Sequence, residues 1–361
     1  MAVHFANVPE VEALLGLMLS LPSVAIILSA ALFGVMAERF GRMPMLMIAL
    51  SLYAMGGASG LFADTMTSIL IGRIVLGVGV AGTMTIAMML AGELWNGPAR
   101  MKFMGKQSAT MSLGGVVFIT FGGFLAEISW RGAFALYLLA LPVAVLALMY
   151  IKPQPKPHKR AGGQKVPLDW GVCLKIGALG FMTMAIFYVI PVRLPFVLAD
   201  IGVTSTAVSG MILASVTLSG VLTSMNFQRI GRALSPIAIY AVCFGLFAIG
   251  YGLIGTATTV FQIVIGTLTT GLALGAIMPN QNSWLMSVIA PEARGRAAGL
   301  MTTFVFLGQF CGPMFAGLLG MFLSLKGIFI AFALVAASIS ALLFFVARIS
   351  AGNAAASADR V

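Results

Sequence analysis

A short charged segment, GVMAERFGRMP (34–44), stands between two long apolar stretches. Gly34 permits a close helix contact and Gly41 a turn with positive φ, so the segment predicts a tight helix–loop–helix. Its carboxylate and arginines would form a charge cluster at the membrane face. The alternative is a solvated loop that only satisfies the charge bias of membrane topology. The candidate residues of this segment are Gly34, Glu38, Arg39, Gly41 and Arg42, with Glu93 as a candidate second acidic partner for Arg42.

Arg73 lies inside another apolar stretch, ILIGRIVLGVG (69–79), about six residues or ~9 Å from its end. A cation in lipid costs at least about 2.5–3.5 kcal/mol, so its side chain is expected to face the protein interior or an aqueous cavity. The alternative is an arginine that extends to the nearby interface. We expect Arg73 to serve a function rather than packing alone.

Small residues recur at spacings that place them on one helix face, where they permit close packing between helices. Plain packing is therefore their expected role. These residues are Gly77, then Gly114, Gly122 and Gly123, and, in a second similar stretch, Gly308, Gly312 and Pro313.

Few polar side chains lie within the apolar stretches, and a substrate cavity would be built from some of them. Asn280 and Asn282 have an equal alternative, which is to cap an irregular helix after Pro279. The candidate cavity residues are Gln107, Tyr188, Asn280, Asn282 and Gln309.

Other chemistry is excluded by what the chain lacks. All ten acidic residues fall at the ends of apolar stretches or in loops, so no carboxylate is expected at the membrane midplane. The two histidines and three cysteines have no ligand-like spacing, and no cluster has catalytic spacing. We therefore expect no metal, no cofactor and no enzymatic activity.

The composition predicts the kind of elements that position these residues. The chain has 361 residues, of which 60% are hydrophobic and 9% charged, whereas a soluble domain carries about 25% charge. Stretches long enough to cross a bilayer predict an all-α polytopic membrane protein with eleven spans. These spans are expected at 13–37, 44–63, 67–92, 103–126, 132–151, 171–194, 205–227, 234–256, 258–288, 297–321 and 327–347.

The basic residues that give the net charge of +11 lie mainly in the connections between the predicted spans. Alternate connections hold 17 of the 21 basic residues, three lie on the opposite side and Arg73 lies within a span. Because Lys and Arg accumulate in cytoplasmic loops, this predicts an external N-terminus and a cytoplasmic C-terminus. The basic charge thus indicates a lipid bilayer as partner and not a nucleic acid.

An internal repeat divides the chain. A shift of 194 residues pairs Gly72 with Gly266 and Arg100 with Arg294, which predicts a duplicated bundle. The span at 171–194 has no counterpart in the first half, so we expect a first helix to be missing, with five spans followed by six. The expected parts are an N-terminal bundle (1–151), a basic cytoplasmic linker (152–170), a C-terminal six-helix bundle (171–348) and a disordered cytoplasmic tail (349–361).

The segment 34–44 strongly resembles the signature loop of the Major Facilitator Superfamily, G-x-x-x-D-R-x-G-R-[RK]-x-[RK]. Glu38 replaces its aspartate, and Met43 and Met45 replace the basic residues that end it. The duplication and the basic linker extend the resemblance over nearly the whole chain. It implies two pseudo-symmetric helical bundles that are gated at the cytoplasmic face by the charged loop.

Two further stretches are similar to family motifs. Arg73 resembles the intramembrane arginine of proton-coupled members. The stretch with Gly312 and Pro313 resembles an antiporter motif that normally belongs to the first half, where this chain has Phe118 and Ile119 instead of the Gly-Pro pair. This departure weakens the expectation of antiport.

The resemblance implies a monomeric secondary transporter of the drug-efflux branch in the bacterial plasma (inner) membrane. It would export small, moderately apolar molecules by alternating access and couple their export to protons. One alternative is an uncoupled or uptake facilitator for a metabolite such as a sugar or organic acid, which the missing midplane carboxylate favours. Another is a truncated, non-transporting remnant.

Overall fold

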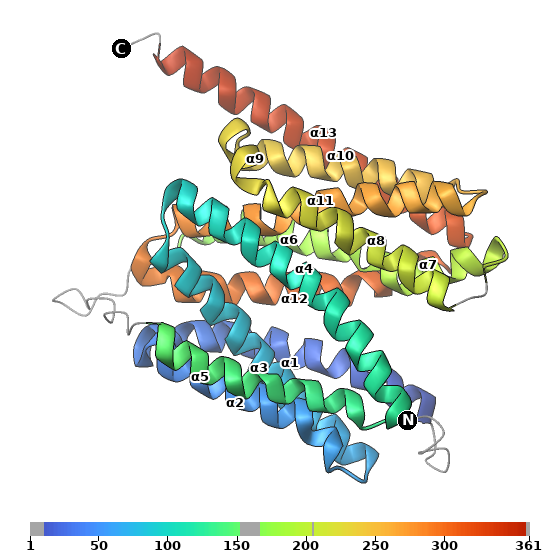
Figure 1. Cartoon of the computed structure of the whole chain (residues 1–361). Coiled ribbons are helices and arrows are strands. Elements are labelled where there is room, and N and C mark those ends of the chain that lie inside the picture. The colour runs from blue at the N-terminus through green and yellow to red at the C-terminus, as the bar shows by residue number, and fades with distance from the viewer. Residues whose placement is uncertain (1–10, 152–166, 204–205, 359–361) are drawn as a thin grey trace. The chain divides into compact units, whose positions relative to one another are not determined.

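The computed structural model describes residues 11–151, 167–203 and 206–358, which form helices joined by short turns (Figure 1). Most of the expected linker, up to residue 166, lies outside these ranges. By contacts, the chain divides into two compact units, each of which takes residues from both halves of the sequence. Unit 1 is Met1–Leu94, Val117–Phe181 and Leu285–Phe310; unit 2 is Trp95–Val116, Met182–Trp284 and Cys311–Val361.

Ten helical segments of the described chain are long and apolar enough to cross a membrane. They coincide with ten of the eleven predicted spans. The remaining stretch, 103–126, is also helical, within α4 (Gly97–Ile128), but is not among the ten. The predicted count of eleven spans is therefore approximate.

Unit 1 is built on three helices that pack on one another, α1, α2 and α3 (Figure 1). The 3₁₀-helix η2 and helix α5 pack against α2. Their bounds are α1 (Val11–Phe40), α2 (Arg42–Ala58), η1 (Ser59–Leu61), α3 (Met66–Leu94), η2 (Gly132–Leu139) and α5 (Ala140–Tyr150). The unit also takes the larger part of α6 (Trp170–Phe187), η3 (Pro291–Ala293) and the first part of α12 (Arg294–Leu319).

In unit 2, α10 packs against α13 (Figure 1), and aromatic side chains of the two helices form a core between them. Phe247, Tyr251 and Phe329 are fully buried there, and the Tyr251 hydroxyl donates a hydrogen bond to the carbonyl of Ile186. Its helices are α7 (Val189–Asp200), α8 (Thr206–Met225), α9 (Phe227–Ala233), α10 (Pro236–Gly255), α11 (Val260–Val288) and α13 (Leu325–Ala358). Helix α13 extends to Ala358, whereas the sequence led us to expect a disordered tail from residue 349.

The turn predicted at Gly41 is confirmed. A single residue separates α1 from α2, and its φ of 102° lies in the left-handed region that glycine adopts without strain. The charged side chains on either side of this turn therefore lie at the end of α1 and the start of α2.

Candidate functional site

Glu38 joins the end of α1 to the beginning of α12. Its carboxylate accepts hydrogen bonds from the backbone nitrogen of Arg296, at 2.9 Å, and from Nε of the same residue, at 3.1 Å. Arg296 is the third residue of α12, where backbone N–H groups have no partner within the helix. A carboxylate at this position also interacts favourably with the helix dipole.

Arg42 and Glu93 form a second ion pair, between the first turn of α2 and the last turn of α3. Nε of Arg42 lies 2.8 Å from Oε1 of Glu93, and Nη2 donates to the same oxygen. Only 5% and 14% of the two side chains are exposed. The expected pairing of Arg42 with Glu93 is confirmed.

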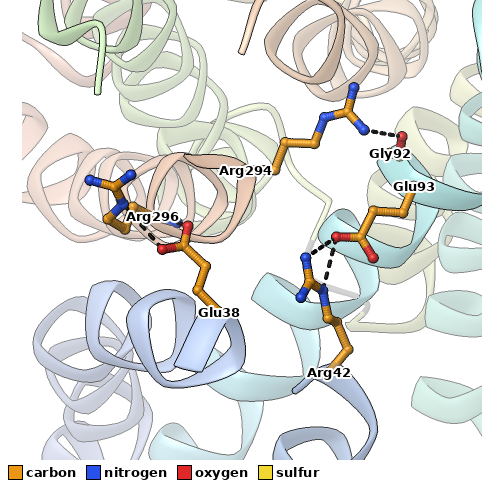
Figure 2. A network of polar contacts seen from close by, with 6 residues as sticks. All are labelled: Glu38, Arg42, Gly92, Glu93, Arg294 and Arg296. Carbon is orange, nitrogen blue, oxygen red and sulfur yellow. Dashed lines mark hydrogen bonds and ion pairs between the residues drawn. The ribbon is translucent and has the colours of Figure 1, made fainter. Parts of the chain in front are cut away.

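Arg294 makes the third contact at this end of unit 1. Its Nη1 donates to the backbone carbonyl of Gly92, at 2.8 Å, in the last turn of α3. A carbonyl at that position has no partner within its own helix. Figure 2 shows the three contacts side by side. We call the residues that make them the Glu38 network: Glu38, Arg42, Gly92, Glu93, Arg294 and Arg296.

Arg39, expected in the same cluster, lies apart from these contacts. Its side chain is exposed, with the guanidinium carbon 5.3 Å from the centre of the Phe40 ring. The sequence did not indicate Arg296 as the partner of Glu38, because 258 residues separate the two. The sequence feature that could have pointed to this partner is that Arg296 lies in a short connection that carries basic residues.

Glycines allow α1 and α12 to approach closely beside the network. A Cβ at Gly34 would collide with the carbonyl of Gly295, and one at Gly295 would lie 2.5 Å from the carbonyl oxygen of Gly34. A Cβ at Gly299 would lie 2.5 Å from the oxygen of Ala30. The close contact predicted for Gly34 is confirmed, with α12 as the partner.

Gly295→Ala is therefore expected to destabilise the chain by about 1–3 kcal/mol, since its methyl group must push two backbones apart. Gly115→Ala is the matched control, because nothing lies within 4 Å of the added Cβ. That control is expected to be neutral or stabilising, as alanine is the better helix former. Thermal unfolding in detergent measures both variants, and equal melting temperatures would contradict the close crossing.

Hydroxyl groups continue the contact of α12 with α1 and α3. Oγ1 of Thr85 donates to Oγ1 of Thr302 over 3.3 Å, and both side chains are buried. Thr303 donates to the carbonyl of Ile27 over 3.2 Å.

Arg73 faces the interior of unit 1, as predicted. It is 7% exposed and lies against Phe134 and Tyr137 of η2. The alternative of an arginine that extends to the interface does not fit this burial.

The small-residue positions differ between the two stretches. On α12, a Cβ at Gly308 or Gly312 would collide with the backbone of α6, at Phe181 and Ala185 respectively. On α4, a Cβ at Gly122 would lie 3.5 Å from Leu136, which is an ordinary contact. The remaining positions are Gly77 on α3, against Pro22 and Ala25 of α1, Gly114 and Gly123 within α4, and Pro313 within α12.

Asn280 has a structural partner. It is 2% exposed, and its Nδ2 donates to the carbonyl of Pro236, at the start of α10. Helix α11 continues through Pro279, so no irregular helix begins there. The other cavity candidates, Gln107, Tyr188, Asn282 and Gln309, are half-buried; Gln309 belongs to unit 1 and the rest to unit 2.

Comparison with known proteins identifies the family. The sequence pattern of the Major Facilitator Superfamily matches residues 10–192 and 176–360, which together cover nearly the whole chain. The chain belongs to the Major Facilitator Superfamily. It is thus a membrane-spanning transporter of small molecules.

The superfamily relatives include transporters with different named substrates. Multidrug resistance protein 1 of Bacillus subtilis (strain 168) is 23% identical over 317 residues, which cover 84% of this chain and 80% of that protein. The human organic anion transporter MFSD10 (TETRAN) has a TM-score of 0.79 at 19% identity, over 91% of this chain and 82% of that chain. The proton:xylose symporter XylE has a TM-score of 0.77 at 18% identity, and the match covers 92% of this chain and 86% of that chain. These structures confirm the predicted fold class.

Proposed function

We propose that the chain is a secondary active transporter that exports small, moderately apolar molecules, coupled to protons, by alternating access. The observation that carries this proposal is the Glu38 network, in which polar contacts link the start of α12 to the ends of α1 and α3. The similarity to a protein named for multidrug resistance supports the substrate class.

The network would act as a gate. Helices α1 and α3 belong to the predicted N-terminal bundle (1–151) and α12 to the predicted C-terminal bundle (171–348). Rocking of the bundles would separate α12 from α1 and α3 at this end and break the Glu38–Arg296 and Arg294–Gly92 contacts. The basic residues around the network favour the cytoplasmic side for this end, which would put the N-terminus outside a bacterial plasma (inner) membrane. A monomer suffices for this mechanism.

Arg73 would serve coupling, because it is a buried cation in a membrane-spanning helix. In cells that express the chain, we expect efflux of a lipophilic cationic dye to stop when a proton uncoupler is added. Arg73→Gln is expected to lower the initial efflux rate at least roughly ten-fold, and Arg73→Lys to retain more of it, because the charge remains.

The same dye measurement can contradict each part of the proposal. Loss of efflux in Arg73→Gln together with uncoupler-insensitive efflux in the unchanged chain would overturn proton coupling. Efflux no higher than in cells without the chain would overturn drug export.

A facilitator for a metabolite such as a sugar or organic acid is the second candidate. It is favoured by the sequence, in which every acidic residue falls at a span end or in a loop, and by the structural similarity to a xylose symporter. Counterflow of a labelled sugar in vesicles without a pH gradient would favour this candidate.

A further inference from the structure

The Arg73 guanidinium lies between two aromatic rings. Its central carbon is 4.6 Å from the centre of the Phe134 ring and 5.4 Å from that of Tyr137. Its Nη1 donates to the Tyr137 hydroxyl over 3.2 Å. The buried Nε has no hydrogen-bond partner, and Arg73 forms no ion pair within the described ranges. Ring faces therefore stabilise this cation in place of a carboxylate.

The geometry of η2 explains why two rings meet one cation. In a 3₁₀-helix, residues three apart eclipse one another, so Phe134 and Tyr137 project in the same direction. In an α-helix the two side chains would be offset by about 60°. A 3₁₀-helix of eight residues is longer than usual, and this one leads directly into α5.

Two glycines leave the space that the rings occupy. A Cβ at Gly57 would collide with the Tyr137 ring, and one at Gly60 with the Phe134 ring. The Tyr53 ring also lies 5.6 Å from that of Tyr137. The rings are thus fixed by α2 and η1, and they offer the guanidinium a defined position.

We propose that Phe134 and Tyr137 are positioning residues for Arg73, which hold its charge inside the membrane without neutralising it. The proposal rests on the role of Arg73 in transport given above. An ion pair would cancel most of the field of the cation, whereas a neutral ring leaves its charge available to an anionic group.

The test replaces Phe134 in the full chain with phenylalanines that carry one, two or three fluorines. Fluorination keeps the shape of the ring but progressively weakens its attraction for a cation. We expect the melting temperature and the initial efflux rate both to fall with each fluorine, the rate by roughly ten-fold in total. Tyr137→Phe, which keeps the ring and loses the hydroxyl, is expected to retain more transport than Tyr137→Leu.

Two controls separate an effect on the Phe134–Arg73 contact from a general effect of fluorine on a buried ring. The same series at Phe329, a buried ring of unit 2 that packs on Tyr251, is expected to leave the efflux rate unchanged. The Phe134 series in the Arg73→Gln background is expected to leave the melting temperature unchanged.

The outcomes distinguish this inference from the proposed function. Impaired efflux in Arg73→Gln with no effect of fluorine on efflux would overturn the positioning role alone. An equal effect of fluorine on melting with and without Arg73 would overturn the cation–ring contact. Wild-type efflux in Arg73→Gln would overturn the proposed role of Arg73, and the melting series would still test whether the rings hold the cation.

Discussion

Glu93→Gln is expected to lower the melting temperature of the chain by roughly 10 °C, because it removes one partner of a buried ion pair. The Arg42 side chain is 5% exposed and would remain as an uncompensated charge. Loss of one partner of a buried pair costs about 3–5 kcal/mol, and each kcal/mol corresponds to about 2–4 °C in a protein of 150–250 residues. Thermal unfolding of the purified protein in detergent measures the shift.

The exposed pair of unit 1 gives the matched control. Arg131 and Asp64 also form an ion pair, but their side chains are 28% and 83% exposed. Asp64→Asn is expected to cost less than about 1 kcal/mol, because water screens this pair. Replacing both partners of the buried pair, Arg42→Met with Glu93→Leu, is expected to recover much of the lost stability. Equal shifts for Glu93→Gln and Asp64→Asn would show that burial of the pair is not what stabilises it.

Glu38→Gln is expected to lower the rate of transport roughly ten-fold or more. The substitution removes the charge that accepts two hydrogen bonds from Arg296, and charged hydrogen bonds contribute about 1.5–3 kcal/mol each. The state in which α12 contacts α1 would lose stability relative to the open state. A transporter must pass through both the closed and the open state in each cycle. Turnover therefore slows when the equilibrium between the two states shifts strongly toward either of them.

Glu292→Gln is the matched control for this substitution. Glu292 lies just before α12 and makes no hydrogen bond or ion pair in the described structure; its carboxylate acts on Arg294 only through longer-range electrostatic attraction. The initial efflux rate of Glu292→Gln is expected to stay near that of the unchanged chain. If both variants transport equally fast, the Glu38–Arg296 contact is not part of the gate.

Much of the local structure was predictable from the sequence, since it depends on neighbouring residues. The turn at Gly41 follows from the freedom of glycine at positive φ, and its φ of 102° agrees. The burial of Arg73 follows from the cost of a cation in lipid. The apolar stretches predicted helices at all eleven positions, and ten of these are among the candidate spans of the described chain.

The partners of these residues were harder to predict. Glu38 and Arg296 are 258 residues apart in the sequence. One of the two hydrogen bonds that Glu38 accepts comes from the backbone N–H of Arg296, which does not depend on the type of residue there. The rings around Arg73 depend on η2 being a 3₁₀-helix, and the sequence of that segment is as apolar as its neighbours. Pairing of this kind depends on how helices cross, which periodicity along one helix does not specify.

Reversible cross-linking of α3 to α12 tests most directly whether this contact opens during transport. Thr85 and Thr302 suit the test because both are buried, lie in contact and stand outside the Glu38 network. Thr85→Cys with Thr302→Cys, in a chain whose three native cysteines are replaced by serine, is oxidised with a membrane-permeant reagent. Efflux is then measured before and after reduction, with each single variant as control. We predict that oxidation abolishes efflux and that reduction restores it; undiminished efflux through the cross-linked protein would contradict the gate.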